Sequence, residues 1–421
     1  MIYSLSTHMT LAASLGLFVL AACCPVGNGL LGDPSNPYPL KTPPKVGEIV
    51  HLPTGTVVSQ AQMLTVAGDA RIVYIGETHD NPASHRLELE VLQGLAGLHP
   101  GHQALGMEMF SHSQQPALDR WVAGRLDEKS FLKESHWYDI WNSDFAYYRD
   151  LLIFARDKKI PVIALNADKN IVESVRSKPI EKLSPEEQAQ LPKLDMSDPY
   201  QRAMVEAYFG DHIHGPMHLE DFLRVQTLWD ETMAQSVARY LASPAGRDRH
   251  LLVIAGGNHV NNGFGIPRRA FRRLPVSYMS IGGQEISGLA DKKDRMMNVK
   301  LPEFPMVPFD FLAYMAYENL PQTGIRLGVI IETEPNGQGL LVKNVLPKSI
   351  AERSGLLAGD TLLAIDGETL ADNIDLVYAL KRKHPGDHVI LKVNRQGEIL
   401  NVDVLIQPDM KGHPLDKDLP R

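Results

Sequence analysis

The sequence has very little cysteine, and the position of that cysteine is informative. Of the 421 residues only Cys23 and Cys24 are cysteines, and they lie next to each other near the N-terminus. The body of the chain therefore contains no disulfide, no thiolate metal site and no thiol nucleophile. Any catalysis or metal binding there must use histidine, carboxylate, hydroxyl or lysine side chains.

The chain also lacks an excess of positive charge and a long apolar run. Its formal net charge is −8, whereas a nucleic-acid-binding protein needs a basic surface for the phosphates, so that class is excluded. The apolar stretch at residues 9–22, MTLAASLGLFVLAA, is shorter than the ~20 residues of a membrane-spanning helix. A hydrophobic content of 44% and a charged content of 22% are typical of a globular protein. The length predicts two or three domains.

The apolar stretch fits the core of a signal peptide instead. It ends in LAAC, Leu20 to Cys23, which resembles a bacterial lipobox, in which the cysteine is lipidated and becomes the mature N-terminus. Because no Lys or Arg precedes Cys23, a signal peptide cleaved without lipidation is the alternative. We expect a lipoprotein signal peptide at 1–23, a Pro/Gly-rich tether at 24–44 and a lipid anchor in the bacterial cell envelope, facing the periplasm or in the outer membrane.

Between 45 and 295, short apolar runs alternate with helical patterns. The runs are RIVYIG, HQALGMEMF, IPVIALNAD and HLLVIAGGNH, and the stretches between them, such as FLRVQTLWDETMAQSVARYL, repeat apolar residues at helical spacing. A strand that alternates with a helix indicates a parallel sheet. The sequence therefore predicts an α/β domain with a mostly parallel sheet flanked by helices.

Polar side chains end or follow these predicted strands. Ligands of open parallel sheets bind at the carboxyl ends of the strands, and the glycines of two Gly-x-x-His segments, 76–79 and 256–259, permit sharp turns there. Two imidazoles and two carboxylates could bind a divalent metal or act as general acids and bases. We therefore expect one site at this edge, formed by Glu77, His79, Glu108 and His259, with Asn166, Asp168 and Asn258 nearby.

Four other features have both a functional and a structural interpretation. His85 begins the helix after the first turn and could be exposed or functional, and the segment GDHIHGPMH could bind metal or be a polar loop. The aromatic segment HWYDIW could form core or a wall for a flat ligand, and RRAFRR could bind carboxylates or be a solvated face. The residues concerned are His85; His212, His214, Met217 and His218; Trp137, Tyr138 and Trp141; and Arg268 to Arg273.

The segments YIGETHDNPASH, GMEMF and GGNHVNNGFGIPRR, with the helical stretches between them, resemble the ChaN-like haem-binding lipoproteins. That family is grouped with the Tiki proteases, TraB proteins and erythromycin esterases, which share a Gly-Glu-x-His segment, a second Gly-x-x-His and acidic residues between them. The resemblance covers about 45–290 and implies either haem or iron uptake or metal-dependent proteolysis. It implies haem or a divalent metal ion as cofactor, with His79 and His259 as candidate haem-binding residues. A haem would need a Tyr, His or Met ligand.

The segment at 318–410 resembles a PDZ domain of the bacterial protease type, on the run NVLPKSIAERSGLLAGDTLLAIDGETL. Ile350 stands where proline is usual and Ser354 where alanine is usual. The resemblance implies that the loop Arg326, Leu327, Gly328 and Val329 captures a peptide carboxylate, that the following strand pairs with the peptide, and that a helix from Ile374 to Lys383 closes the groove with Leu376, Val377 and Leu380. No protease domain accompanies it, so it would recruit a partner through that partner's C-terminal peptide.

Three hypotheses follow from the sequence. The chain is an exported lipoprotein that binds haem or iron for uptake or handling, a metal-dependent hydrolase or peptidase that uses Glu77, His79, Glu108 and His259, or a PDZ scaffold without catalytic activity. The two intact Gly-x-x-His segments argue against the scaffold.

Overall fold

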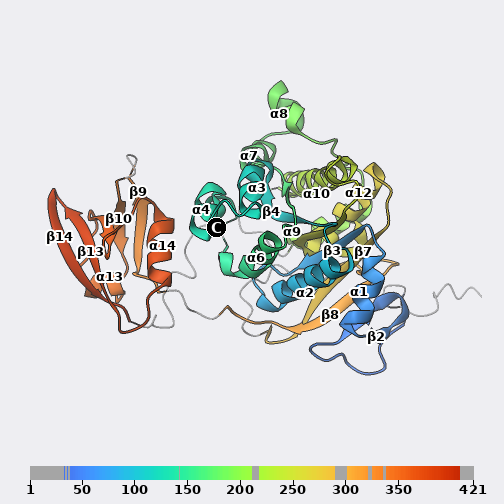
Figure 1. Ribbon diagram of the computed structural model, residues 1–421. Helices are drawn as coiled ribbons and strands as arrows, with labels where there is room; N and C mark the ends of the chain where they lie inside the picture. The colour runs from blue at the N-terminus through green and yellow to red at the C-terminus, as the bar shows by residue number, and fades with distance from the viewer. Residues whose placement is uncertain are drawn as a thin grey trace, which may run out of the picture.

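The computed structural model describes Asp33, Asn36 and residues 38–141, 143–210, 218–289, 301–320, 325–334 and 338–407. It shows an α/β domain followed by a small β domain (Figure 1). Cys23 and the tether residues 24–32, 34–35 and 37 lie outside these residues, as do His212, His214 and Met217. Within the described ranges, no helix combines the length and apolar character that a membrane crossing requires.

The α/β domain is built on one eight-stranded sheet with the order β2-β1-β8-β7-β3-β6-β4-β5. The pairs from β8 to β5 are all parallel, and β1 pairs antiparallel with both β2 and β8. The mostly parallel sheet predicted from the sequence is thus confirmed. The strands are β1 (Ile49–His51), β2 (Thr56–Val58), β3 (Ile72–Glu77), β4 (Gln103–Ser111), β5 (Val162–Asn166), β6 (His250–Gly256), β7 (Tyr278–Ser287) and β8 (Phe311–Ala316).

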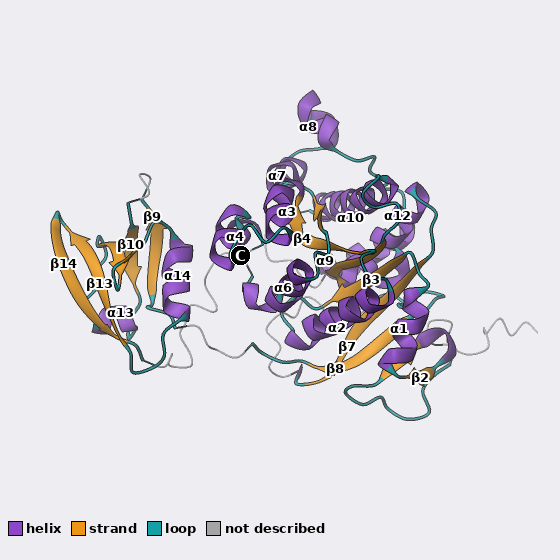
Figure 2. Cartoon of the chain, in the orientation of Figure 1, coloured by secondary structure: helices purple, strands orange, loops and turns teal. Residues whose placement is uncertain are grey.

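Helices cover both faces of this sheet (Figure 2). On β3, Val73 and Ile75 join a core with helices α1, α2, α3 and α6, while Ile72 and Tyr74 join a core with α10 and α12. Burial on both faces explains why the strands are apolar runs without alternation. The helices are α1 (Gln60–Gly68), α2 (Pro82–Leu98), α3 (Gln115–Val122), α4 (Glu128–Glu134), α5 (Trp137–Ile140), α6 (Arg149–Asp157), α7 (Lys169–Ser177), α8 (Pro185–Gln190), α9 (Pro199–Gly210), α10 (Leu219–Ala242), α11 (Gly257–Val260) and α12 (Ile266–Arg273).

Short 3-10 turns link these elements in the described residues: η1 (Leu52–Thr54), η2 (His112–Gln114), η3 (Phe145–Tyr147), η4 (Ile180–Lys182) and η5 (Asn261–Gly263). The crossovers decide where the functional side chains meet. The chain runs from β3 through α2 to β4 and leaves a gap in the sheet that β6 fills later. The carboxyl ends of β3, β6 and β4 are therefore neighbours, although β6 comes more than a hundred residues after β4 in the sequence.

The sheet extends beyond position 295, the end of the α/β domain expected from the sequence. Strand β8 pairs in parallel with β7 and antiparallel with β1, and its residues are buried almost throughout. Residues between the two expected domains, Phe311–Ala316, thus contribute a strand to the first sheet. The first sheet therefore includes residues up to Ala316, because β8 lies inside it between β1 and β7.

The C-terminal domain is a six-stranded antiparallel sheet with two helices. Its order is β14-β13-β11-β10-β9, with β12 paired to β11, so β9 is an edge strand that lies beside α14. The elements are β9 (Val329–Thr333), β10 (Leu340–Val345), α13 (Ile350–Arg353), β11 (Thr361–Ile365), β12 (Glu368–Thr369), α14 (Asn373–Lys381), β13 (His388–Arg395) and β14 (Glu398–Leu405).

Helix α14 also contacts the first domain at α4. Lys129 and Lys133 of α4 form ion pairs with Asp375 at 2.6 and 2.7 Å, and Lys133 also pairs with Asp372 at 2.9 Å. Tyr378 of α14 packs against the core of the α/β domain. The helix that borders the edge strand of one domain is thus held by a charged cluster on the other.

Candidate functional site

Strand β3 ends at a pair formed by Glu77 and His79. Nδ1 of His79 donates a hydrogen bond to Oε1 of Glu77, and the hydroxyl of Tyr148 donates to the same oxygen at 2.7 Å. Glu77 is buried, whereas the His79 side chain is 32% exposed. Since Nδ1 is held by the carboxylate, Nε2 is the nitrogen of His79 that is available to a ligand.

The charges of this pair stabilise each other. Burial disfavours the charged imidazole, but the Glu77 carboxylate outweighs burial and raises the pKa of His79 to about 9. Burial, together with repulsion from Glu88, raises the pKa of Glu77 to about 7, against the lowering effect of the two nearby histidines. Glu77 therefore titrates close to neutral pH.

The second histidine segment begins with Gly256, which packs against His79. A Cβ at this position would lie 2.8 Å from Nε2 of His79, too close for any side chain. Its N–H donates to Oε2 of Glu108 at 2.7 Å. Gly256, at the end of β6, thus lies between His79 and Glu108. Because it has no side chain, the Glu77–His79 pair and Glu108 can both pack against its backbone.

The other predicted residues form a second buried ionic group. Nδ1 of His259, on α11, donates to Oδ1 of Asp230 at 2.7 Å, and its Nε2 lies 3.4 Å from Oε1 of Glu108. Burial opposes the charge, but these two carboxylates raise the pKa of His259 to about 10. Burial likewise opposes the charge on Glu108, but His259 lowers the pKa of Glu108 to about 2. His259 is therefore a cation at neutral pH, with both ring nitrogens facing carboxylates.

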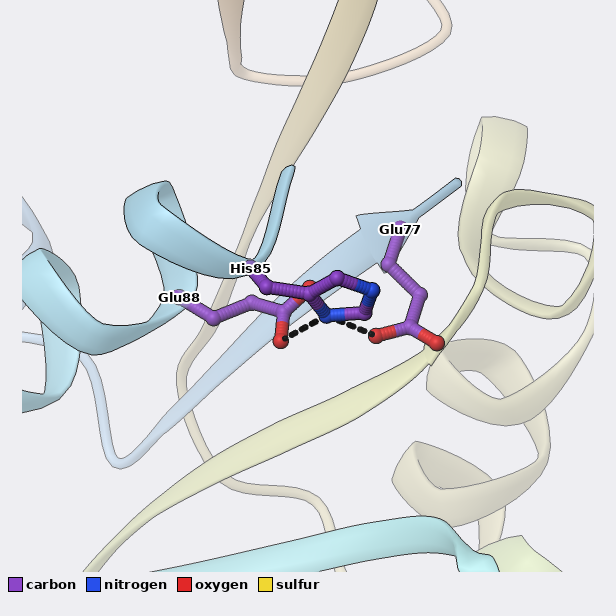
Figure 3. A group of neighbouring side chains, drawn as sticks. All are labelled: Glu77, His85 and Glu88. Atoms are coloured by element: carbon purple, nitrogen blue, oxygen red, sulfur yellow. Dashed lines mark hydrogen bonds and ion pairs between the residues drawn. The ribbon is translucent and has the colours of Figure 1, made fainter. Parts of the chain in front are cut away.

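A third group lies on the other side of Glu77. Figure 3 shows His85 of α2 with its Nδ1 facing Glu88 and Glu77. Nδ1 of His85 is 3.1 Å from Oε2 of Glu88 and 3.6 Å from Oε2 of Glu77. Among the described residues, these three are the set whose candidate metal-binding atoms all lie within 4.8 Å of one another. All three are buried, so the interpretation of His85 as an exposed side chain is wrong.

The structure thus brings the four predicted residues to one edge of the sheet, as two ionic pairs. The third group shares only Glu77 with them. The metal and catalytic roles assigned to Glu77, His79, Glu108 and His259 stay predictions. Of the neighbours, Asn166 donates to the carbonyl of Glu108 at 3.2 Å, and Asp168 accepts from the N–H of Ser113 at 2.9 Å, so both brace the strand ends.

The remaining candidate residues lie in the core, in ion pairs or at the surface. Trp137 is fully buried core, whereas the ring of Trp141 stands edge-on to His79 at 5.1 Å between centroids. In RRAFRR, Arg269 is buried, and Glu231 pairs with Arg269, Arg272 and Arg273. These arginines already have a carboxylate partner within the chain. His218 is the exposed residue that precedes α10.

Sequence reasoning missed Tyr148, Glu88, Gln226 and Asp230, which contact the predicted residues. Gln226 and Asp230 are both buried on α10, where a nitrogen of Gln226 lies 3.1 Å from Nδ1 of His259. Their spacing of four places them on one face of the helix. Two polar residues at that spacing inside an apolar stripe were the available signal. Glu88, three residues after His85 on α2, carried the same kind of signal.

Two family models match parts of this chain. Residues 63–270 match the family model described as haem-binding uptake, Tiki superfamily, ChaN, and residues 326–406 match the PDZ domain model. The chain carries a ChaN-family domain followed by a PDZ domain. The ChaN domain contains both Gly-x-x-His segments, the Asp230–His259 pair and the Glu77–His85–Glu88 group.

Individual relatives cover only parts of the chain. A periplasmic serine endoprotease of the DegP-like type from Halomonas elongata is 42% identical over 69 residues, which are 16% of this chain and 15% of that protein. The regulator of sigma-E protease RseP from Escherichia coli is 35% identical over 65 residues, 15% of this chain and 14% of that protein. The chain thus spans about one seventh of the length of these relatives. Both names describe proteases, and the match covers only a small part of each.

Among solved structures, one described as cofacial heme binding to ChaN of Campylobacter jejuni aligns with 67% of this chain and 100% of its own. The sequence identity is 15% and the TM-score is 0.49.

Proposed function

We propose that this protein is an exported lipoprotein that binds haem through its ChaN domain and recruits a protein partner through its PDZ domain. The observation that supports haem binding is the fixed orientation and partial exposure of the His79 imidazole. Glu77 fixes its Nδ1, so the ring presents Nε2, and about a third of the side chain is exposed. It is the histidine of the two ionic pairs that reaches solvent, because His259 is only 2% exposed.

The residues around His79 fit a flat iron-containing ligand. Haem supplies, when bound, an iron that accepts an imidazole nitrogen. Glu77 orients the imidazole, as carboxylates do for histidine ligands, and Trp141 offers an aromatic wall beside it. His79 must release its Nε2 proton to act as ligand. The biological role would be uptake or handling of haem or iron in the cell envelope.

Titration of the purified protein with haem tests this part. We expect a Soret band that shifts and saturates for the native chain and is lost or strongly weakened for His79→Ala. His384→Ala is the control, because that histidine lies on the PDZ surface with an 85% exposed side chain. Equal spectra for native protein and His79→Ala would remove His79 as the haem ligand.

Export and anchoring rest on the sequence around Cys23. The match of the PDZ segment to proteins named as periplasmic supports export. Cys23→Ala should move the protein from the membrane fraction to a soluble one, and Cys24→Ala should not. A single acyl chain binds membranes only marginally, so stable anchoring requires more than one chain. Identical fractionation of native protein and Cys23→Ala would contradict the anchor.

A metal-dependent hydrolase is the second candidate. One observation favours it: the pKa of Glu77 is raised to about 7, which suits a general base near neutral pH. His259 weakens it, because a histidine held between two carboxylates as a cation cannot accept a proton. Under this hypothesis Glu77→Gln keeps the fold but abolishes hydrolysis of a peptide substrate. Undiminished hydrolysis by that variant would exclude Glu77 as the base.

A further inference from the structure

We propose that Glu77, His85 and Glu88 bind a divalent transition-metal cation of the zinc or manganese class inside the ChaN domain. The ligands would be Oε2 of Glu77, Nδ1 of His85 and a carboxylate oxygen of Glu88. This site is separate from the exposed face of His79. It does not depend on haem binding, because it rests on the geometry of these three side chains alone.

The protonation state of His85 is set by its backbone contact. Nε2 of His85 lies 3.1 Å from the carbonyl oxygen of His79, and a carbonyl only accepts, so Nε2 carries the hydrogen. Burial lowers the pKa of His85 and favours the neutral ring. Nδ1 of a neutral ring then points its lone pair at one oxygen of Glu77 and one of Glu88. When both carboxyl groups are ionised, these oxygens also carry only lone pairs. Three acceptors that face one another need a proton or a cation between them.

The same contact is the arrangement that metal-binding histidines use. Such histidines donate their second ring N–H to a carbonyl or carboxylate, which fixes the ring and its tautomer. The distances also fit. Ligands about 2.0–2.2 Å from a zinc ion lie about 3.3–3.6 Å apart at tetrahedral angles, and Nδ1 of His85 is 3.1 and 3.6 Å from the two carboxylates. The three candidate ligand atoms all lie within 4.8 Å of one another, so side-chain adjustments alone would let one cation contact all three.

Unpartnered atoms point to the same place. Oε2 of Glu77 and Oε1 of Glu88 are buried and have no hydrogen-bond partner in the described part of the chain. Both carboxyl groups are buried, and the other titratable groups that act on them or on His85 are His79, Tyr148 and Asp80. Of these, His79 and Tyr148 are both engaged by Oε1 of Glu77. Buried carboxylates are tolerated when paired or bound to metal, and one imidazolium cannot balance two of them.

The donor atoms indicate the class of cation. Carboxylates alone suit calcium and magnesium, whereas an imidazole with carboxylates suits zinc, manganese or iron. Because Glu77 also contacts His79, a bound cation would affect His79 as well. Oε2 of Glu77 would hold the cation while its Oε1 holds His79, so the cation would fix the carboxylate that orients His79.

Metal titration of the full-length protein tests the site. The protein is stripped with EDTA and titrated with zinc chloride or manganese chloride by calorimetry, with elemental analysis of the dialysed product. We expect one equivalent per chain, and an affinity at least about tenfold weaker for Glu88→Gln and for His85→Gln. Glu90→Gln is the matched control, because Glu90 is exposed on the same helix. It should bind as the native chain does.

Thermal unfolding separates a lost site from a lost fold. Metal should raise the Tm of the native chain and of Glu90→Gln, and not that of Glu88→Gln. Without metal, Glu88→Gln should be at least as stable as the native chain, because it removes a buried carboxylate. Two results would overturn the proposal: no bound metal in the native chain, which would leave a proton shared between the carboxyl groups, or metal binding that survives Glu88→Gln and is lost in His79→Ala. If the protein does not bind haem, the Soret titration shows it, and the outcome of the metal titration does not depend on that result.

Discussion

Oδ1 of Asp230 lies 2.7 Å from Nδ1 of His259, and both side chains are almost completely buried. The pair connects α10 to the turn after β6, two elements that cover the candidate site. Glu108 approaches the same imidazole from β4. The second Gly-x-x-His segment thus serves first to tie a helix to the sheet, and this explains why its histidine has no free ring nitrogen.

Removal of one partner should therefore cost stability. Asp230→Asn leaves His259 with one carboxylate fewer in a buried place, and the loss of one partner of a buried ion pair costs about 3–5 kcal/mol. We expect the free energy of unfolding in urea to fall by about 3 kcal/mol. Glu220→Gln, at an exposed position of the same helix with a 62% exposed side chain, is the control and should leave it almost unchanged. A neutral Asp230→Asn variant would show that the pair contributes nothing to the fold.

The same pair should make stability depend on pH in the alkaline range. The pKa of His259 is raised from its ordinary 6.5 to about 10. A raised folded-state pKa stabilises fully below the ordinary value, and this stabilisation is lost as pH rises through the folded value. The native chain should thus lose stability between about pH 7 and 10. Over this pH range, the free energy of unfolding should fall less for Asp230→Asn than for the native chain. We expect the difference to be at least about 1.4 kcal/mol, the free energy of one pKa unit. Parallel pH curves for the two proteins would contradict this origin.

Much of the fold could be predicted because its signals are local. Apolar runs with no alternation require burial on both faces, and helices between them require parallel strands. The capping box of Ser184 and Glu187 that opens α8 is another signal of this local kind. Strand β8 was missed because nothing in its short apolar run shows that it returns to the first sheet. That pairing depends on β7 and β1, which lie far away in sequence.

The candidate site was predictable in part for the same reason. Strand ends give the edge at which Glu77, His79, Glu108 and His259 meet. Which carboxylate faces which imidazole depends on strand order, and the insertion of β6 between β3 and β4 places Gly256 between the two pairs. His85, Glu88 and Asp230 sit on helices, where a polar residue is usually exposed. Only the packing of α2 and α10 shows that these three are buried.

Charge reversal at the contact between the domains should separate them. Lys129 and Lys133 pair with Asp372 and Asp375 across α4 and α14. The double variant Lys129→Glu, Lys133→Glu places like charges opposite one another, and we expect a larger radius of gyration in X-ray scattering and an unchanged circular dichroism spectrum. Lys158→Glu with Lys182→Glu makes the same charge change on exposed positions elsewhere and serves as control. An unchanged radius for the first variant would mean that the ion pairs do not hold the domains together.

The loop before β9 should be the place where a peptide's C-terminus binds. Leu327 is buried in the PDZ core, and Leu380 of α14 is 5% exposed, so both support the groove from beneath. Gly328 has φ +79°, and a Cβ there would lie 2.2 Å from Cβ of Ser349. Gly328→Ala therefore has to displace the loop between Arg326 and Val329.

We expect Gly328→Ala to weaken binding of a peptide with an apolar, free C-terminus at least about tenfold, and amidation of that peptide to have the same effect on the native chain, since backbone N–H groups lose a charged acceptor. Fluorescence anisotropy with the full-length protein measures both. Gly397→Ala is the matched control, because Gly397 also has a positive φ, +94°, but open space around its Cβ. It carries the backbone strain without the collision, so it should keep the native affinity. If the amidated and free peptides bind equally well, the loop does not recognise a carboxylate. If Gly397→Ala loses affinity as much as Gly328→Ala does, general strain and not the loop explains the loss.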